Sequence, residues 1–573
     1  MSSAKTAAVP DRIVARVAGA AVLVSLFAFL YYLQRRDVLL YGDAVAHINI
    51  ARRVFDSQTP GLLQLGTVWL PLPHLLMIPF IFSDAMWQSG AGGSIPSMIA
   101  YVLGVVGIFR LVRGMLETNS RTKPAAVMSA CAAAFAYGAN PNLIYMQATA
   151  MTESIYLTLF VWAVVYFAEF IRALNANPVG ANQLSPALQR GVRREDPSKS
   201  RRDDPVPTHI LMRCACCLAG AELTRYDGWF LAFVMGAAVV VIVLRQWQNR
   251  ALRRAGAKFL LGIAVAPLLW LAYNRVVYGN ALEFANGPYS AKAIEQRVGA
   301  PNPALHNARV AAIYYLKSGQ LNMAEGNWGR FWVAAAVVAL AVGLRKLRAQ
   351  SAPMLLLWVP LGFYALSIAY GSVPIHVHTW WPFATFNQRY GLQLLPMFAV
   401  SIGLLTGLIC LVRASGRHGG KLAPVTFAFV VLSYASVWKV EPQCLKEARR
   451  NWEIRNTLNS AVEQVIGRLP RNSRFLMELG EHVGVMQQAA IPLRQVVNNE
   501  NHRPWKRPSD PEGLWERALA DPPRYADFVI AFDGDAVDQR ANKINLTELT
   551  EIHATGQPRA RIYAAHSAPN QLH

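Results

Sequence analysis

The chain has 573 residues, of which 53% are hydrophobic and only 16% are charged, and its mean hydropathy is +0.23. Soluble chains carry about a quarter charged residues, so this composition excludes an ordinary soluble protein. The formal charge of +22 falls largely in short clusters between apolar stretches, which is typical of cytoplasmic loops rather than of a nucleic-acid-binding surface. The sequence therefore predicts a multi-pass membrane protein with no nucleic-acid partner.

Eleven apolar stretches before residue 439 have the composition of membrane-spanning helices. In chain order they are residues 17–33, 95–112, 125–138, 154–171, 210–223, 229–244, 259–278, 331–344, 353–370, 392–412 and 422–438. Bulky side chains at residues 27–32 leave no small-residue cleavage site, so the first stretch is predicted to be a span and not a signal peptide. Residues 1–438 are therefore predicted to form an all-α polytopic domain with about eleven transmembrane helices.

Basic residues predict the orientation of these helices. Lysine and arginine gather in every second loop, and the loop at 245–258 holds five bases and no acid. Loops of this kind stay in the cytoplasm, so the N-terminus is predicted to be cytoplasmic in the cell (inner or plasma) membrane. The loop of about 173–209, rich in Pro, Ser and mixed charges, is predicted to be a disordered cytoplasmic linker.

The opposite loops are then extracytoplasmic, and the first of them covers about residues 35–94. Its residues 68–82 are apolar but short, and they contain three prolines. Counting them as a span would place every later basic cluster outside, so they are predicted to form an interfacial or re-entrant helix. A long outer loop of about 279–328 without clear spans is typical of a binding loop or lid.

The chain after Trp438 has a different composition. Residues 439–573 are more polar, with strand-like runs at 474–479, 493–497, 527–532 and 561–564 and a helix-like segment at 512–519. This pattern predicts a small extracytoplasmic α/β domain. Its role is open between acceptor selection and stabilisation of the transmembrane domain.

Ionisable side chains gather in the predicted outer loops, where they cost free energy unless they find partners or act on a ligand. Asp43 and His47 lie one turn apart on the same face if a helix begins at Gly42 or Asp43. Asp43 is then either a helix N-cap or a general base. Glu153 begins a predicted span, where a carboxylate commonly interacts with the helix dipole.

The later outer loops add basic and polar candidates. Arg225 and Asp227 in the third loop either pair with each other or bind a ligand, and Lys292 lies in the long fourth loop. In the fifth loop, Arg389 at the head of a span is either a snorkelling anchor or an anion ligand. His376 and His378 alternate and would share a face in an extended segment, which makes them weak candidates for a metal site. No glycine-rich nucleotide motif lies between a strand and a helix, so no nucleotide cofactor is predicted.

Four segments in this order resemble one family of proteins. They are Gly42-Asp43-Ala44-Val45-Ala46-His47, Trp69-Leu70-Pro71-Leu72-Pro73-His74, Leu223-Thr224-Arg225-Tyr226-Asp227-Gly228, and Asn387-Gln388-Arg389-Tyr390-Gly391-Leu392 with Leu395-Pro396. Their order along a chain of this topology resembles the C-type (GT-C fold) membrane glycosyltransferases. The nearest group is the one containing protein O-mannosyltransferases and lipid A aminoarabinose transferases.

The resemblance implies an enzyme that moves a sugar, with inversion, from a polyprenyl-phosphate carrier to an acceptor protein, lipid or glycan at the outer face of the membrane. It implies that Asp43 is the general base or orients the acceptor, and that Glu153 helps to bind acceptor or metal. Arg225 and Arg389, with Lys292 behind them, are then expected to stabilise the leaving phosphate. His47, Tyr226 and Asn387, which lie in these segments, are further substrate-binding candidates. The partners are a polyprenyl-phosphate-linked sugar, membrane lipid and an acceptor that the sequence does not name.

No cofactor is predicted to be required, and a divalent metal stays an open alternative. The first outer loop argues against a metal requirement, because it has one acid at the key position where some relatives have two. Two other functions remain as alternatives. A multi-pass transporter predicts ionisable residues near the middle of spans and inverted repeats. A non-enzymatic membrane scaffold is the alternative if Asp43 and Glu153 only stabilise helix starts.

Overall fold

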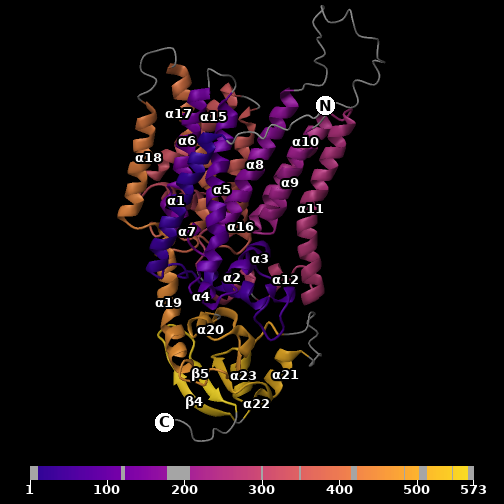
Figure 1. Cartoon of the computed structure of the whole chain (residues 1–573), viewed down its shortest axis with the longest axis vertical. Coiled ribbons are helices and arrows are strands. Elements are labelled where there is room, and N and C mark those ends of the chain that lie inside the picture. Colours follow the sequence, from indigo (N-terminus) through magenta and orange to yellow (C-terminus); the bar gives the residue numbers. More distant parts are fainter. Residues whose placement is uncertain are drawn as a thin grey trace, which may run out of the picture.

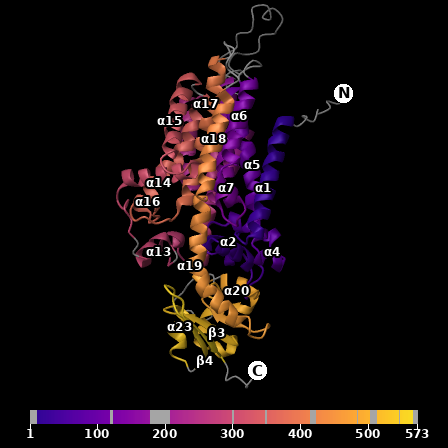
Figure 2. The same cartoon turned by 90° about the vertical axis from the view of Figure 1, so that its left-hand side faces the viewer.

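The structure is a computed structural model that describes residues 11–117, 123–176, 207–288, 290–298, 301–347, 350–413, 422–482, 484–501, 513–544 and 546–565. A long bundle of helices makes up most of it, and a small sheet with short helices lies at one end of that bundle (Figures 1 and 2). The predicted fold class is therefore confirmed: the chain is a mostly helical polytopic membrane protein with a small α/β domain. Most of the predicted linker, residues 177–206, lies outside the described residues.

Each of the eleven predicted spans coincides with a helical segment of the structure. These segments are α1 (Arg12–Gln34), α5 (Ala91–Leu116), α6 (Lys123–Gly138), α8 (Glu153–Ala176), α9 (Thr208–Glu222), α10 (Asp227–Arg245), α11 (Arg250–Tyr278), α15 (Gly329–Lys346), η4 with α16 (Ala352–Trp358 and Val359–Tyr370), η5 with α17 (Gln388–Leu394 and Leu395–Arg413), and α18 (Leu422–Lys439). Seven helical segments in the described part of the chain are long and apolar enough to cross a membrane. The count of eleven spans stays a prediction.

Small residues let the central helices approach closely. A Cβ atom added to Gly107 on α5 would lie 2.7 Å from Val161 on α8, and one added to Gly403 on α17 would lie 2.8 Å from Ala133 on α6. Membrane helices associate through van der Waals packing rather than through exclusion of water, so close backbone approach is the main source of their cohesion. Helices α5, α6, α8 and α17 therefore form the tight centre of the bundle.

Shorter helices connect the long ones. They are α2 (Gly42–Arg53), α3 (Leu72–Met77) with η2 (Ile78–Phe80), α4 (Asp84–Gln88), α7 (Pro141–Gln147), α12 (Glu283–Asn286), α13 (Ala291–Val298) and α14 (Ala308–Met323). Helices α2, α3, α4 and α12 lie between the bundle and the sheet (Figure 1). The apolar residues 68–82 fold into α3 and η2, which are too short to span a membrane, as predicted.

The sheet has the strand order β2-β1-β3-β5-β4. Its strands are β1 (Phe475–Met477), β2 (Val496–Val497), β3 (Phe528–Phe532), β4 (Thr547–Ile552) and β5 (Ala560–Ala564). The first three pair in parallel, and β5 pairs antiparallel with both β3 and β4. Four strands fall in the predicted runs, whereas β4 was missed because this edge strand is largely exposed and carries Thr and Glu in place of an apolar face. The helices of this domain are α20 (Gly484–Gln488), α21 (Leu514–Ala520), α22 (Pro522–Tyr525) and α23 (Ala536–Ala541).

One long helix was not predicted. Helix α19 (Gln443–Ile466) follows α18 almost directly and runs from the bundle to the sheet (Figure 2). Because this helix is largely polar, the hydropathy of the sequence did not reveal it. The sheet domain also packs on the first predicted outer loop: Asn49 donates a hydrogen bond of 2.8 Å to Gln487, and Arg494 pairs with Asp56 at 3.1 Å.

The two ends of the bundle differ in charge. The basic helix ends around Arg245, Arg250 and Arg345 lie at the end away from the sheet (Figure 1). The starts of α2 and α8 and the segment η5, which carry candidate site residues, lie toward the sheet. Loops that the sequence assigned to opposite sides therefore lie at opposite ends of the helical bundle.

Candidate active site

Two arginines from distant parts of the chain meet at one buried carboxylate. Glu153 is the first residue of α8, and its side chain is fully buried. Its Oε1 atom lies 3.3 Å from an Arg225 nitrogen and 3.4 Å from an Arg389 nitrogen. Its Oε2 atom has no hydrogen-bond partner among the described residues. Glu153 is thus a buried bridge between two guanidinium groups as well as a residue that starts a helix.

Arg389 gathers carboxylates from three helices. Its guanidinium pairs with Asp43 from α2 and Glu153 from α8, and lies 3.7 Å from Glu447 of α19. The same group lies over the ring of Tyr41, 4.9 Å from its centroid. Three carboxylates and an aromatic ring thus hold the guanidinium inside the protein. Arg389 therefore binds anionic side chains and does not extend as a snorkelling anchor toward the lipid headgroups.

Arg225, in the turn between α9 and α10, is held by a second set of partners. It pairs with Asp227 at 3.3 Å, as the sequence allowed, and it also reaches Glu153. Arg225 donates a hydrogen bond to the hydroxyl of Tyr364 (3.0 Å), and that hydroxyl donates in turn to Asp227 (3.1 Å). The ring of Tyr390 lies 5.0 Å below the guanidinium. Orientation by several fixed partners is what preorganised electrostatic catalysis requires.

Asp43 occupies the accessible side of this charged centre. The N-cap of α2 is Tyr41, and Asp43 lies in the first turn with its carboxylate turned to Arg389, so the N-cap interpretation is wrong. The Asp43 side chain is 36% exposed, against 0% for Glu153, 2% for Asp227 and 7% for Glu447. Of these four carboxylates, Asp43 is therefore the one that a substrate can reach.

The centre holds more carboxyl groups than guanidinium groups. Four carboxylates face Arg225 and Arg389, so full ionisation would leave an excess of negative charge. Burial raises the pKa of Glu447, while the charge of Arg389 and the backbone N–H groups of Asn387 and Gln388 oppose that rise. Among these carboxylates Asp43 is the most exposed, so it is the one that an anion from outside could most easily displace from Arg389.

His47 lies behind Asp43 in a buried pair. Its Nδ1 atom is 2.9 Å from Nε2 of His74, and its ring packs edge-on against Trp69 at 5.0 Å. Burial, with the positive charges of Arg389 and Arg225, lowers the pKa of His47 to about 3. The structure thus joins two of the resembling segments through a neutral imidazole pair that fastens α3 to α2.

The buried pair predicts a loss of stability in acid. Between about pH 6.5 and pH 3, His47 binds a proton in the unfolded chain but not in the folded one. The free energy of unfolding is therefore highest above the unfolded pKa of about 6.5 and falls as the pH drops below it. At pH 5 the loss is expected to be about 2 kcal/mol from His47 alone. The measurement is the melting temperature in detergent at pH 7.5 and pH 5. His47→Asn should show a smaller acid shift than the unaltered protein, and an equal shift would contradict the assignment.

Among the described residues, the side chains of three other predicted site residues form no hydrogen bond or ion pair with the two arginines. Tyr226 stacks on Phe284 at 5.0 Å and donates its hydroxyl hydrogen bond to the carbonyl of Val68. Asn387 donates its backbone N–H to Glu447 and its side-chain amide to the carbonyl of Pro374. Lys292 is exposed on α13 and forms no ion pair with any described residue. In this conformation, Tyr226 and Asn387 hold loops in place, and Lys292 does not join the charged centre.

The two candidate metal ligands do not meet at one ion site. His376 has its Nε2 atom 2.9 Å from the carbonyl oxygen of Pro301, and His378 lies 3.9 Å from Glu325. The part of the chain that the structure describes contains no group of three or more His, Cys, Asp or Glu side chains placed to hold a metal.

Helix α19 supplies residues that the sequence reasoning missed. Besides Glu447, Asn451 accepts a hydrogen bond of 2.7 Å from the backbone N–H of Gly42. Arg455 donates hydrogen bonds of 3.3 Å to the carbonyls of Leu39 and Leu40. Its guanidinium also interacts electrostatically with Asp43. Polar residues spaced by four along a helix share one face, so the series Gln443, Glu447, Asn451 and Arg455 was the sequence pattern that could have revealed this contribution.

Fold and site together define a multi-pass membrane protein with a buried, charge-rich centre at the sheet end of its helical bundle. Comparisons with known proteins give no matching family model and no matching curated protein. Among solved structures, the chain is similar to ArnT from Cupriavidus metallidurans bound to undecaprenyl phosphate, with 13% identity, a TM-score of 0.49, and coverage of 96% of this chain and 98% of that one.

It is also similar to the Archaeoglobus fulgidus oligosaccharyltransferase tethered with an acceptor peptide, with 13% identity, a TM-score of 0.46, and coverage of 97% of this chain and 75% of that one. A structure of that oligosaccharyltransferase, AglB, in complex with an inhibitory peptide and a dolichol-phosphate gives 12% identity and the same TM-score of 0.46 and coverage. ArnT and AglB are GT-C fold glycosyltransferases, the class that the four sequence segments resemble.

Proposed function

We propose that the chain is an inverting glycosyltransferase that moves a sugar from a polyprenyl-phosphate carrier to a hydroxyl or phosphate of an acceptor at the outer face of the membrane. The observation that carries the proposal is the convergence of Arg225 and Arg389 on Glu153, beside the accessible carboxylate of Asp43. Fixed cations next to an accessible base are the two parts that this reaction needs.

The arginines support departure of the carrier phosphate. When the bond between the sugar and the phosphate breaks, negative charge develops on the leaving phosphate, and preorganised guanidinium groups stabilise that charge. Arg389 binds the phosphate by exchanging Asp43 for it, since the other carboxylates around the arginines are buried. Guanidinium suits this exchange because it binds carboxylates and phosphates through the same paired N–H groups.

The released Asp43 then serves the acceptor. Its carboxylate accepts the proton of the acceptor hydroxyl while the acceptor oxygen attacks the anomeric carbon and the carrier phosphate leaves on the opposite side. Glu153 is too buried to contact the acceptor in this conformation, so we assign it the positioning of both arginines. This assignment narrows the sequence-based expectation, in which Glu153 also bound acceptor or metal.

The experiment is release of free polyprenyl phosphate from polyprenyl-phosphate sugars by purified protein in lipid. We expect release from at least one sugar donor, above the level of protein-free lipid. Parallel reactions with and without EDTA determine whether a divalent metal takes part. No release and no binding across several donors would contradict the proposal and favour a transporter or a scaffold. Against a transporter stands the position of the charged centre at helix ends and not at mid-span.

We further propose that the N-terminus faces the cytoplasm and that the sheet domain lies outside. The basic helix ends far from the sheet support this orientation. In intact cells, an impermeant thiol reagent should label Lys292→Cys on exposed α13 and should not label Trp247→Cys between α10 and α11. Both variants should react after permeabilisation, and the unaltered protein serves as the blank. Labelling of Trp247→Cys alone in intact cells would invert the orientation.

A further inference from the structure

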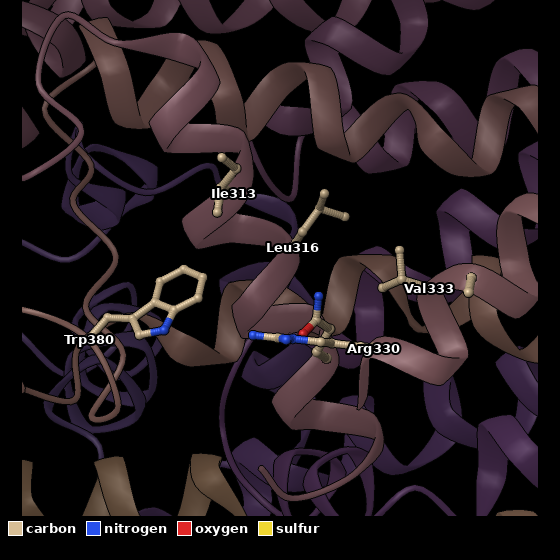
Figure 3. A pocket seen from close by; sticks show the side chains of 7 residues that line it. Ile313, Leu316, Arg330, Val333 and Trp380 are labelled. Carbon is tan, nitrogen blue, oxygen red and sulfur yellow. The ribbon is translucent and has the colours of Figure 1, made fainter. Parts of the chain in front are cut away.

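A second site candidate lies on the outer side of α14. A cavity of about 470 Å³ is lined by Ile313, Leu316 and Gln320 from α14, by Arg330 and Val333 from α15, and by Trp380 (Figure 3). Its lining is mostly apolar, and Gln320 and Arg330 contribute polar side chains. A mostly apolar lining of this kind suits a hydrocarbon chain.

The helix α14 separates this cavity from the charged centre. On one face of α14, Ser318 donates a hydrogen bond of 2.7 Å to the carbonyl of Gln388, next to Arg389, and Tyr315 stacks on Tyr364 at 4.5 Å. The cavity residues Leu316 and Gln320 are four residues apart and lie on another face. The cavity is therefore distinct from the proposed active site.

The cavity lies beside the start of α15, which contains the span predicted at residues 331–344. Around it, Ile313 is 46% exposed, Trp328 is 68% exposed and Phe331 is 52% exposed. Large exposed apolar side chains, with a tryptophan at the helix start, are typical of the zone where a membrane helix meets the lipid headgroups. Arg330 lies in the first turn of α15 and is itself exposed, so a bilayer crossed by α15 would bring its headgroups to this charge.

The lining carries one exposed positive charge, that of Arg330, and the buried Lys317 follows the lining residue Leu316 in the chain. Neither Arg330 nor Lys317 forms an ion pair with another residue in the described ranges. Lys317 is buried, gives one hydrogen bond to the carbonyl of Gly326 (2.9 Å), and lies 5.9 Å from the ring centroid of Trp380. Burial and the charge of Arg330 lower the pKa of Lys317, and the nearby Glu325 partly opposes this. That carboxylate already accepts a hydrogen bond from Gln443 and faces His378.

We propose that this cavity binds an acidic phospholipid of the surrounding bilayer, with an acyl chain along Ile313 and Leu316 and the phosphate against Arg330. Charge complementarity selects an anionic headgroup, and the apolar wall selects a lipid over a free anion. A bilayer phospholipid fits better than the sugar carrier, because α14 stands between this cavity and the arginines at which the carrier phosphate would react. The site would bind lipid whether or not the proposed transferase activity is correct.

Native mass spectrometry of the purified protein tests the proposal. Samples are equilibrated with phosphatidylglycerol, phosphatidylcholine or a polyprenyl phosphate. The unaltered protein should retain phosphatidylglycerol in preference to phosphatidylcholine, and Arg330→Gln should bind it about tenfold more weakly, as expected for loss of a charge-assisted hydrogen bond. The matched control is Arg309→Gln, which replaces an exposed arginine on α14 that does not line the cavity. This variant should bind phosphatidylglycerol like the unaltered protein.

Equal retention of the acidic and the neutral lipid, or unchanged binding in Arg330→Gln, would overturn the site. Preferential retention of polyprenyl phosphate, lost in Arg330→Gln, would instead assign the cavity to the carrier and overturn the phospholipid assignment. Because Arg330 is exposed, its replacement should leave the melting temperature in lipid-free detergent unchanged. Asp43→Asn should retain phosphatidylglycerol like the unaltered protein, which separates failure of this proposal from failure of the proposed enzyme.

Discussion

Replacing Asp43 with Asn is expected to abolish sugar transfer while leaving the protein folded. The amide keeps the shape of the side chain but cannot accept a proton, and loss of a general base typically lowers the rate by about 10²–10⁴-fold. The ion pair to Arg389 is lost as well, but Asp43 is partly exposed, so the free energy of unfolding should fall by no more than about 1 kcal/mol. The rate of polyprenyl phosphate release and the melting temperature measure the two effects.

Asp84→Asn is the matched control. Asp84 also lies in the first turn of a short helix in the same loop, and it pairs with the buried Arg52, but it is outside the charged centre. Its replacement should leave the release rate near that of the unaltered protein. If Asp43→Asn kept its activity and instead melted at a much lower temperature, Asp43 would be a structural residue and the proposed base would be wrong.

Replacing Arg389 with Gln is expected to lower both stability and activity strongly. The substitution leaves Glu153 and Glu447 buried with less compensating charge, and removal of one partner from a buried ion pair typically costs about 3–5 kcal/mol. It also removes the cation that we assign to the leaving phosphate. The melting temperature in detergent should fall by several degrees, and sugar release should be lost at temperatures where the variant remains folded.

A double variant separates the two roles of Arg389. Arg389→Gln combined with Glu447→Gln removes one of the uncompensated carboxylates, so part of the lost stability should return while activity stays absent. Arg110→Gln is the control for loss of a surface ion pair, because Arg110 pairs with Glu169 with its side chain 45% exposed, and the cost should be below about 1 kcal/mol. Recovery of activity in the double variant would show that Arg389 only balances charge.

Much of the fold followed from the order of residues. Apolar stretches of span length became helices because the lipid interior accepts only backbones whose hydrogen bonds are made internally. Alternation of basic loops placed Asp43, Glu153, Arg225 and Arg389 at helix starts or turns on one side, although Asp43 and Arg389 are 346 residues apart. Their shared side was therefore predictable from local sequence, and this is why four candidates converge.

Contacts across helices could not be read in the same way. Glu447 reaches Arg389 only because of the direction in which α19 leaves the bundle. The sequence shows only that this helix has a polar face. The burial of His47 against His74 similarly depends on how the first loop folds back on itself. Tyr226 and Lys292 were candidates by the same local criteria, yet their side chains do not pair with the arginines.

The sequence by itself thus determined which segments form helices of span length, at which end of the bundle the candidate residues gather and which residue types are present there. Only the tertiary structure decided which carboxylates share Arg389, that Asp43 is the most accessible of the four, and that α14 separates an apolar cavity from the charged centre. The physical reason is that hydropathy and charge act on each segment independently, through its transfer between water and lipid. Side-chain pairing and accessibility depend instead on the packing of all segments together.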